Sequence, residues 1–226
     1  MGTVNPLKGK SILIMGDSHV DGTPMGMTLE KMLTESGASV KRFGWGGSAA
    51  RTWLAGKKAM GKQYTLDQVK AGGPYDIAII SLGTNDAANA GVGTQDASKL
   101  TAEAVKAVGQ IKQIADMVGA KDTWWVEPPL MKDTVKHYTN FNVNFVRQEG
   151  RKTFGDKAID ATSVGTPDSD GVHLYSVGGK AWAKVVHDRV MAGTTSLGLS
   201  TPLLWGGGLF LAVALGFAVV KLRQRA

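Results

Sequence analysis

Short apolar runs alternate with amphipathic segments along residues 1–192 of this chain. The apolar runs, bounded by glycine, proline or charged residues, predict five β-strands at residues 11–15, 38–43, 76–82, 123–126 and 158–161. Segments with apolar side chains on one helical face predict helices at residues 28–36, 49–60, 66–70, 96–118, 141–152 and 177–192. This alternation predicts an α/β domain over residues 1–192, with a parallel five-stranded sheet between two helical layers.

The last part of the chain breaks this pattern. Residues 203–220 (LLWGGGLFLAVALGFAVV) contain no charged or strongly polar side chain, and the basic tail 221–226 follows them. An apolar stretch of this length is about the minimum that crosses a bilayer. We therefore predict a membrane-spanning or membrane-inserting helix at 203–220, joined to the α/β domain by a linker at 193–202.

Small side chains recur every fourth position in this apolar segment, at Gly208, Ala212 and Gly216. This spacing lets two helices approach closely and indicates a homo-oligomer. A core helix or a tail docked within an assembly would show the same composition. The N-terminus carries no recognisable export signal. The sequence thus indicates attachment to a membrane by one C-terminal helix, on a side that it does not specify, or a component of a phage virion.

The amino-acid composition excludes or disfavours several classes of functional site. The 226 residues include no cysteine, which excludes disulfides, thiolate metal ligands and a cysteine nucleophile. Only four histidines are present, without an HExxH motif, so we expect neither a metal nor a cofactor. The net charge of +7 comes from scattered basic residues without interleaved aromatic residues, and we expect no nucleic-acid partner. The first turn lacks GxGxxG, which argues against a dinucleotide-binding domain.

Polar residues and glycines follow three of the predicted strands and precede the last helix. The segments are GDS at 16–18, GWGGS at 44–48, GTND at 83–86 and DGVH at 170–173. Because the carboxyl ends of parallel strands meet at one edge of a sheet, we expect these four segments to lie together.

These segments contain the groups needed for nucleophilic attack on an ester. Ser18 becomes a useful nucleophile when His173 takes its proton, and Asp170 can hold the imidazole of His173 in the required tautomer. The resulting oxyanion can accept hydrogen bonds from the backbone N–H groups of Ser18 and Gly47 and from the side-chain amide of Asn85.

In these motifs the chain resembles the SGNH (GDSL-type) hydrolases over about residues 10–192. The resemblance implies a flavodoxin-like sandwich with strand order 2-1-3-4-5, in which Ser18, Gly47, Asn85, Asp170 and His173 are the functional residues. The oxyanion glycine is ambiguous, since Gly44 and Gly46 lie in the same turn. We prefer Gly47 because it directly precedes a predicted helix start.

Three further residues are weaker candidates for substrate contacts: His19, Trp45 and Asp86. His19 stands where the family usually has leucine, and Asp86 is more typical of a residue that stabilises its own turn. The resemblance implies a serine esterase or deacylase that removes a small acyl group, such as acetyl, from a carbohydrate, an envelope component or a lipid. The alternative is a structural or virion-assembly protein that retains the hydrolase fold and uses residues 203–220 for membrane insertion or oligomerisation.

Overall fold

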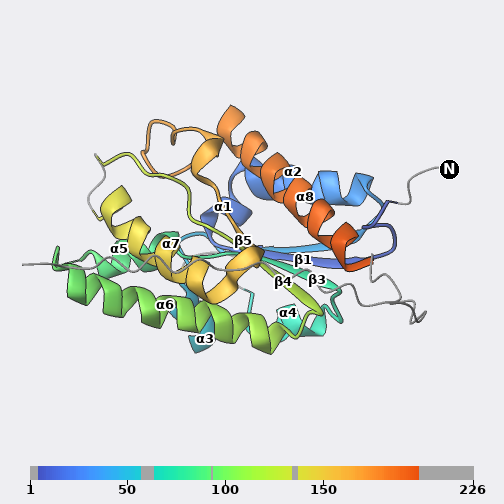
Figure 1. Ribbon diagram of the computed structural model, residues 1–226, viewed down its shortest axis with the longest axis horizontal. Coiled ribbons are helices and arrows are strands. Elements are labelled where there is room, and N and C mark those ends of the chain that lie inside the picture. Colours follow the sequence, from blue (N-terminus) through green and yellow to red (C-terminus); the bar gives the residue numbers. More distant parts are fainter. Residues whose placement is uncertain (1–4, 57–63, 93, 134–136, 199–226) are drawn as a thin grey trace, which may run out of the picture.

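The computed structural model describes residues 5–56, 64–92, 94–133 and 137–198, which form a parallel five-stranded sheet between two layers of helices (Figure 1). The strand order is β2-β1-β3-β4-β5, as predicted. β5 is two residues shorter than predicted. The strands are β1 (Ser11–Gly16), β2 (Ser39–Gly44), β3 (Ile77–Ser81), β4 (Asp122–Val126) and β5 (Ala158–Ile159).

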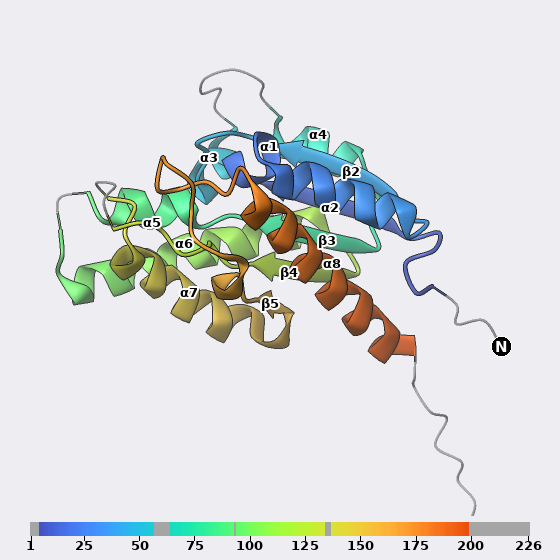
Figure 2. The same ribbon diagram turned by 90° about the horizontal axis from the view of Figure 1, so that it is seen from above.

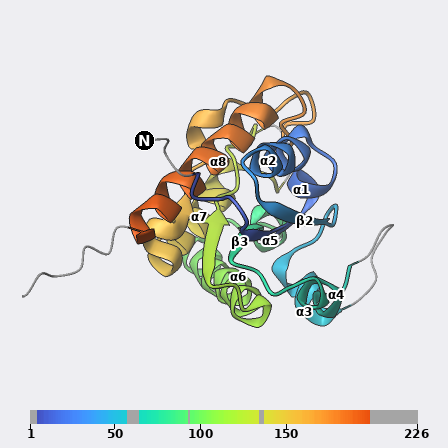
Figure 3. The same ribbon diagram turned by 90° about the vertical axis from the view of Figure 1, so that its right-hand side faces the viewer.

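Helices cover both faces of this sheet, and the view along the strands separates the two layers clearly (Figure 3). One face carries α1 (Ser18–Asp21), α2 (Pro24–Glu35) and α8 (Val177–Gly198). The other face carries α3 (Ala50–Ala55), α4 (Leu66–Ala71), α5 (Thr84–Ala90), α6 (Ala97–Val118) and α7 (Asn140–Phe154). Two short 3₁₀ turns, Gly155–Lys157 and Thr162–Val164, flank β5.

The apolar runs of the central strands fill two separate cores. In β1, Leu13 and Met15 point into the core under α3, α4 and α6, whereas Ile12 and Ile14 point into the core under α2 and α8. All four side chains are completely buried. Because successive strand residues face opposite sides of a sheet, a strand covered on both faces must be apolar at every position. This is why β1 reads as a continuous apolar run.

Helix α8 is longer than the sequence predicted and packs beside α2 (Figure 2). It continues to Gly198, so residues 193–198, predicted as linker, are helical. A Cβ atom on Gly193 would lie 2.4 Å from the ring of Trp124, so the absence of a side chain lets α8 lie against β4. The hydroxyl of Thr194 donates to the Val190 carbonyl within the helix.

The predicted membrane helix at 203–220, its three small residues and the tail 221–226 lie outside the described residues. Within the part of the chain that the structure describes, no helix combines the length and the apolar character needed to cross a bilayer.

The sequence also did not predict two short helices that begin at motif residues. α1 begins at Ser18 directly after β1, and α5 begins at Thr84 directly after β3. Neither contains enough apolar positions to produce a helical pattern. Both lie at the carboxyl edge of the sheet, where the polar turns meet.

Candidate functional site

Ser18 is held at the carboxyl end of β1 by a tight strand-to-helix turn. A Cβ atom on Gly16 would lie 2.3 Å from the Ser81 carbonyl oxygen, so only glycine lets the ends of β1 and β3 approach this closely. Asp17 then caps α1, because its Oδ1 accepts from the backbone N–H of His19 at 3.0 Å. Ser18 is therefore the first residue of α1, with a partly exposed side chain.

The hydroxyl of Ser18 is in hydrogen-bond contact with His173, 155 residues further along the chain. Ser18 Oγ lies 2.7 Å from His173 Nε2, and His173 Nδ1 lies 2.6 Å from Asp170 Oδ2. A carboxylate can only accept, so Nδ1 carries the proton and Nε2 is left to accept the hydroxyl proton of Ser18. These three predicted residues thus form one hydrogen-bonded chain with the polarity that a general base requires.

Asp170 is held in its charged form. Burial acts to raise its pKa, but the backbone N–H groups of His173 and Val172, each 2.9 Å from Oδ1, together with the His173 imidazole, lower the pKa to about 2. An anionic Asp170 keeps the proton on Nδ1 and stabilises the imidazolium that forms when Nε2 accepts a proton.

The second and third turns are joined to each other at the same edge of the sheet as Ser18. The Asn85 side-chain nitrogen donates to the Ser48 carbonyl at 3.0 Å, so the Asn85 amide lies one residue from Gly47. Of the three candidate glycines, Gly44 packs against the backbone of Asp21, and the N–H of Gly46 donates to the Asp21 carboxylate at 3.3 Å.

Gly47 differs from these two glycines. It is exposed, its φ is +73°, and a Cβ atom there would meet nothing within 4 Å. Its positive φ, rather than crowding, explains the preference for glycine, and it remains the predicted oxyanion glycine.

Two tyrosines beside these residues were not identified from the sequence. Tyr138, in the loop before α7, donates its hydroxyl to Asn85 Oδ1 at 2.9 Å. Tyr175 is half-exposed, and its ring centroid lies 5.2 Å from that of His173. Neither belongs to a motif, and only the folded chain brings them to the site.

His19 and Trp45, two predicted substrate contacts, are buried. His19 is completely buried, with its ring centroid 5.1 Å from that of His173 and 4.9 Å from that of Trp182. Burial, reinforced by His173, lowers the pKa of His19 to about 3, so its ring is neutral. Trp45 packs edge-on against Trp53 in the core. Neither ring is exposed to a ligand in this structure.

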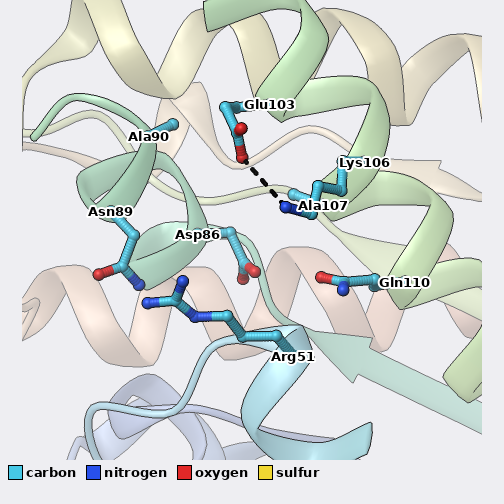
Figure 4. A pocket seen from close by; sticks show the side chains of 8 residues that line it. All are labelled: Arg51, Asp86, Asn89, Ala90, Glu103, Lys106, Ala107 and Gln110. Carbon is cyan, nitrogen blue, oxygen red and sulfur yellow. Dashed lines mark ion pairs between the residues drawn. The ribbon is translucent and has the colours of Figure 1, made fainter. Parts of the chain in front are cut away.

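Asp86, the third weaker candidate, supports a neighbouring helix. Both of its carboxylate oxygens accept from the Ala50 N–H, at 3.0 and 3.2 Å, and this contact holds the start of α3 beside α5. Burial raises its pKa to about 6. Figure 4 shows its carboxylate in a small polar hollow between α3, α5 and α6, with Arg51 and Gln110 nearby. Ser18 and His173 do not line this hollow.

Asp17 is a buried carboxylate directly beneath the site. Burial, with a further contribution from the charge of Asp86, raises its pKa to about 7 despite the hydrogen bond from His19. Its Oδ2 has no hydrogen-bond partner among the described residues. Within the same residues, no group of three histidine or carboxylate side chains is arranged to hold a metal ion.

Comparisons with known proteins identify the fold. No protein-family model matches the sequence, and no curated protein matches it. Among solved structures, the chain is similar to one assigned as an arylesterase from Agrobacterium tumefaciens, with 20% identity, a TM-score of 0.61 and coverage of 81% of this chain and 99% of the other.

Two further structures agree with this fold. A lipase/acylhydrolase from Enterococcus faecalis has a TM-score of 0.60 at 14% identity, covering 81% of this chain and 96% of its own. A variant of Axe2, an acetyl-xylooligosaccharide esterase from Geobacillus, has a TM-score of 0.56 at 15% identity, covering 81% of this chain and 94% of its own. The described part of this chain therefore has the fold of the SGNH-type esterases and lipases.

Proposed function

We propose that this protein is a serine ester hydrolase that uses Ser18, His173 and Asp170. The observation that supports this most directly is the 2.7 Å contact between Ser18 Oγ and His173 Nε2. The same imidazole is hydrogen-bonded on its other side to the charged Asp170. The partial exposure of Ser18 and of His173, whose side chain is 21% exposed, leaves the reacting atoms accessible to a substrate.

The reaction proceeds in two halves. Ser18 Oγ attacks the ester carbonyl carbon while its proton passes to His173 Nε2, and the tetrahedral intermediate collapses as Nε2 returns that proton to the departing alcohol oxygen. Water then attacks the acyl-serine, with His173 Nε2 again taking and returning one proton. The products are a carboxylic acid and an alcohol, and Asp170 remains ionised throughout.

The oxyanion formed in each half requires hydrogen-bond donors. The backbone N–H groups of Ser18 and Gly47 and the side-chain nitrogen of Asn85 are the candidates, and the Asn85–Ser48 bond keeps the last two close together. Loss of one such donor typically costs about 3–4 kcal/mol of transition-state stabilisation. The protein supplies this stabilisation from groups that folding has already oriented.

The substrate that we propose carries a small acyl group, such as acetyl, on a carbohydrate or envelope component. The similarity to an acetyl-xylooligosaccharide esterase supports this class only through the shared fold. Attachment to a membrane through residues 203–220 remains a prediction from the sequence. A panel of p-nitrophenyl esters of increasing acyl length, followed by acetylated oligosaccharides, tests the acyl preference and the alcohol separately.

Labelling with a fluorophosphonate tests the proposed chemistry. The probe should modify Ser18, as located by peptide mass spectrometry, and Ser18→Ala should neither label nor hydrolyse p-nitrophenyl acetate. Ser176, whose hydroxyl donates to the Asp168 carboxylate at 3.0 Å, provides a matched control, and Ser176→Ala should label normally. If the wild-type protein neither labels at Ser18 nor hydrolyses any ester of the panel, the proposal is wrong.

A further inference from the structure

Tyr138 contacts the candidate oxyanion hole but has no part in the reaction described above. Its hydroxyl donates to Asn85 Oδ1 at 2.9 Å, although 53 residues separate the two along the chain. It lies in the loop that leads into α7, whereas the other residues of the site come from the turns after β1, β2 and β3 and from the segment before α8. This contact determines how the Asn85 amide is held.

The orientation of the Asn85 amide follows from what its neighbours can do. The Ser48 carbonyl can only accept a hydrogen bond, so the Asn85 nitrogen, 3.0 Å away, must face it. The side-chain oxygen of Asn85 then lies on the other side of the amide, where the Tyr138 hydroxyl donates to it. The two bonds hold the amide plane from opposite ends. One N–H of the Asn85 nitrogen is used by Ser48, which leaves its second N–H as the candidate donor to the oxyanion.

The segment that carries Tyr138 is anchored where it enters α7. Thr139 caps α7, and its hydroxyl accepts from the Asn142 N–H at 3.2 Å. The side-chain amide of Asn140 makes two bonds to the backbone of Met131, both of 2.8 Å. The backbone that follows Tyr138 is thus held at the start of α7, and the bond to Asn85 fixes the position of its hydroxyl.

The hydroxyl of Tyr138 keeps its proton under conditions in which an ester hydrolase works. Burial, together with the negative charge of Asp17, raises the pKa of Tyr138. A protonated hydroxyl that donates to the Asn85 oxygen polarises the amide, which makes the free N–H a stronger donor. Both effects, orientation and polarisation, strengthen a hydrogen bond to the charged oxyanion more than one to the neutral ester carbonyl.

We infer that Tyr138 is a positioning residue that orients the Asn85 amide toward the oxyanion, an inference that rests on the proposed ester hydrolysis. Tyr138 would touch neither the substrate nor the attacking oxygen. Its contribution would pass through Asn85, and this dependence is what an experiment can measure.

Tyr138→Phe tests the inference because it removes only the hydroxyl. We expect kcat for p-nitrophenyl acetate to fall about five- to tenfold, the usual effect of losing one neutral hydrogen bond, with KM nearly unchanged. The rate of fluorophosphonate inactivation should fall by a similar factor, because the phosphonate oxygen occupies the position of the oxyanion. In the Asn85→Ala background, the same substitution should have almost no further effect.

Tyr75→Phe is the matched control, since Tyr75 also donates its hydroxyl to one acceptor, the Val69 carbonyl at 2.8 Å, away from the site. It should lower the melting temperature and leave kcat unchanged. Equal losses of kcat from Tyr138→Phe with and without Asn85, a change in KM alone, or no change would overturn the inference and leave the proposed function intact. A wild-type protein without esterase activity or labelling at Ser18 would overturn both.

Discussion

In the part of the chain that the structure describes, serine, histidine and aspartate make hydrogen-bonded contact at two places, and the two places differ in what surrounds them. The first is the chain from Ser18 through His173 to Asp170. The second joins α2 to α8: Ser36 Oγ lies 2.9 Å from His187 Nε2, and His187 Nδ1 lies 3.1 Å from Asp188 Oδ1. The side-chain types and the two ring contacts are the same.

The backbone around the two serines has opposite polarity. Ser18 is the first residue of α1, where helical N–H groups have no partner within the helix. Ser36 is the C-cap of α2, and its own N–H donates back to the Met32 carbonyl. The last carbonyl oxygens of a helix point outward at this end. An oxyanion formed next to Ser36 would therefore face other negative oxygens.

The acids also differ. The backbone N–H groups of Val172 and His173 hold the Asp170 carboxylate, whereas Asp188 is half-exposed and is bound by Lys184 as well as His187. The comparison teaches that three side chains in contact do not make an ester hydrolase. Donors for the developing negative charge must be built into the same place.

The largest expected difference in catalytic activity is between substitutions of Ser18 and of Ser36. Ser18→Ala should lower kcat/KM for p-nitrophenyl acetate by at least about a thousandfold, because among the described residues Ser18 alone places a hydroxyl against His173 Nε2. Ser36→Ala should leave kcat/KM within about twofold of the wild-type value, as expected for a polar substitution remote from the reacting atoms. A large loss of activity in Ser36→Ala would show that the Ser36–His187–Asp188 group takes part in the reaction.

The next effect concerns the two acids. Asp170→Asn removes the charge that holds the proton on Nδ1, and kcat should fall by about 10²- to 10⁴-fold, while KM changes little. Asp188→Asn makes the same chemical change at the other group and should leave kcat unaltered. Steady-state kinetics on both variants provide the comparison, and equal behaviour of the two would contradict the proposed role of Asp170.

A smaller effect, on the pH dependence of stability, is expected from Asp17, the carboxylate that caps α1. Folding raises the pKa of Asp17 from its ordinary 3.8 to about 7, so between these values the folded protein retains a proton that the unfolded chain has released. The free energy of unfolding should therefore fall as the pH rises from about 4 to about 7. Asp17→Asn still accepts from the His19 N–H but cannot ionise, and should lose up to about 4 kcal/mol of this pH dependence.

Urea unfolding at several pH values measures this difference. Burial also raises the pKa of Asp86, which changes stability in the same direction, but Asp86 is present in both proteins and its contribution largely cancels. Parallel stability curves for wild type and Asp17→Asn would show that Asp17 does not bind a proton on folding.

The smallest expected effect is the contribution of the Ser36–His187 contact to the free energy of unfolding. The Ser36–His187 hydrogen bond joins α2 to α8 and should be worth about 1 kcal/mol. A double-mutant cycle with Ser36→Ala and His187→Ala, followed by thermal unfolding, measures this coupling. The cycle should show coupling in stability and none in kcat, whereas the Ser18–His173 pair should show strong coupling in kcat.

Most of the fold could be predicted because its signals are local. Apolar runs of four to seven residues identified the five strands, and their alternation with helices indicated the parallel sheet. The helices α1 and α5 were missed because they have only four and seven residues, too few to show a helical periodicity in the sequence. The extension of α8 to Gly198 was missed because residues 193–196 (GTTS) are of types typical of linkers and show no amphipathic pattern.

By itself, the sequence determined which residue types follow each strand, and with the strand order this predicted that Ser18, Asn85 and His173 would share one edge of the sheet. Only the tertiary structure decided which side chains make contact there. It brought Tyr138 to Asn85, buried His19 and Trp45, and placed a second serine–histidine pair at the wrong end of a helix. The physical reason is the separation of these residues along the chain. Periodicity and turn chemistry depend on residues a few positions apart, whereas these contacts join distant segments that only the packing of the folded chain brings together.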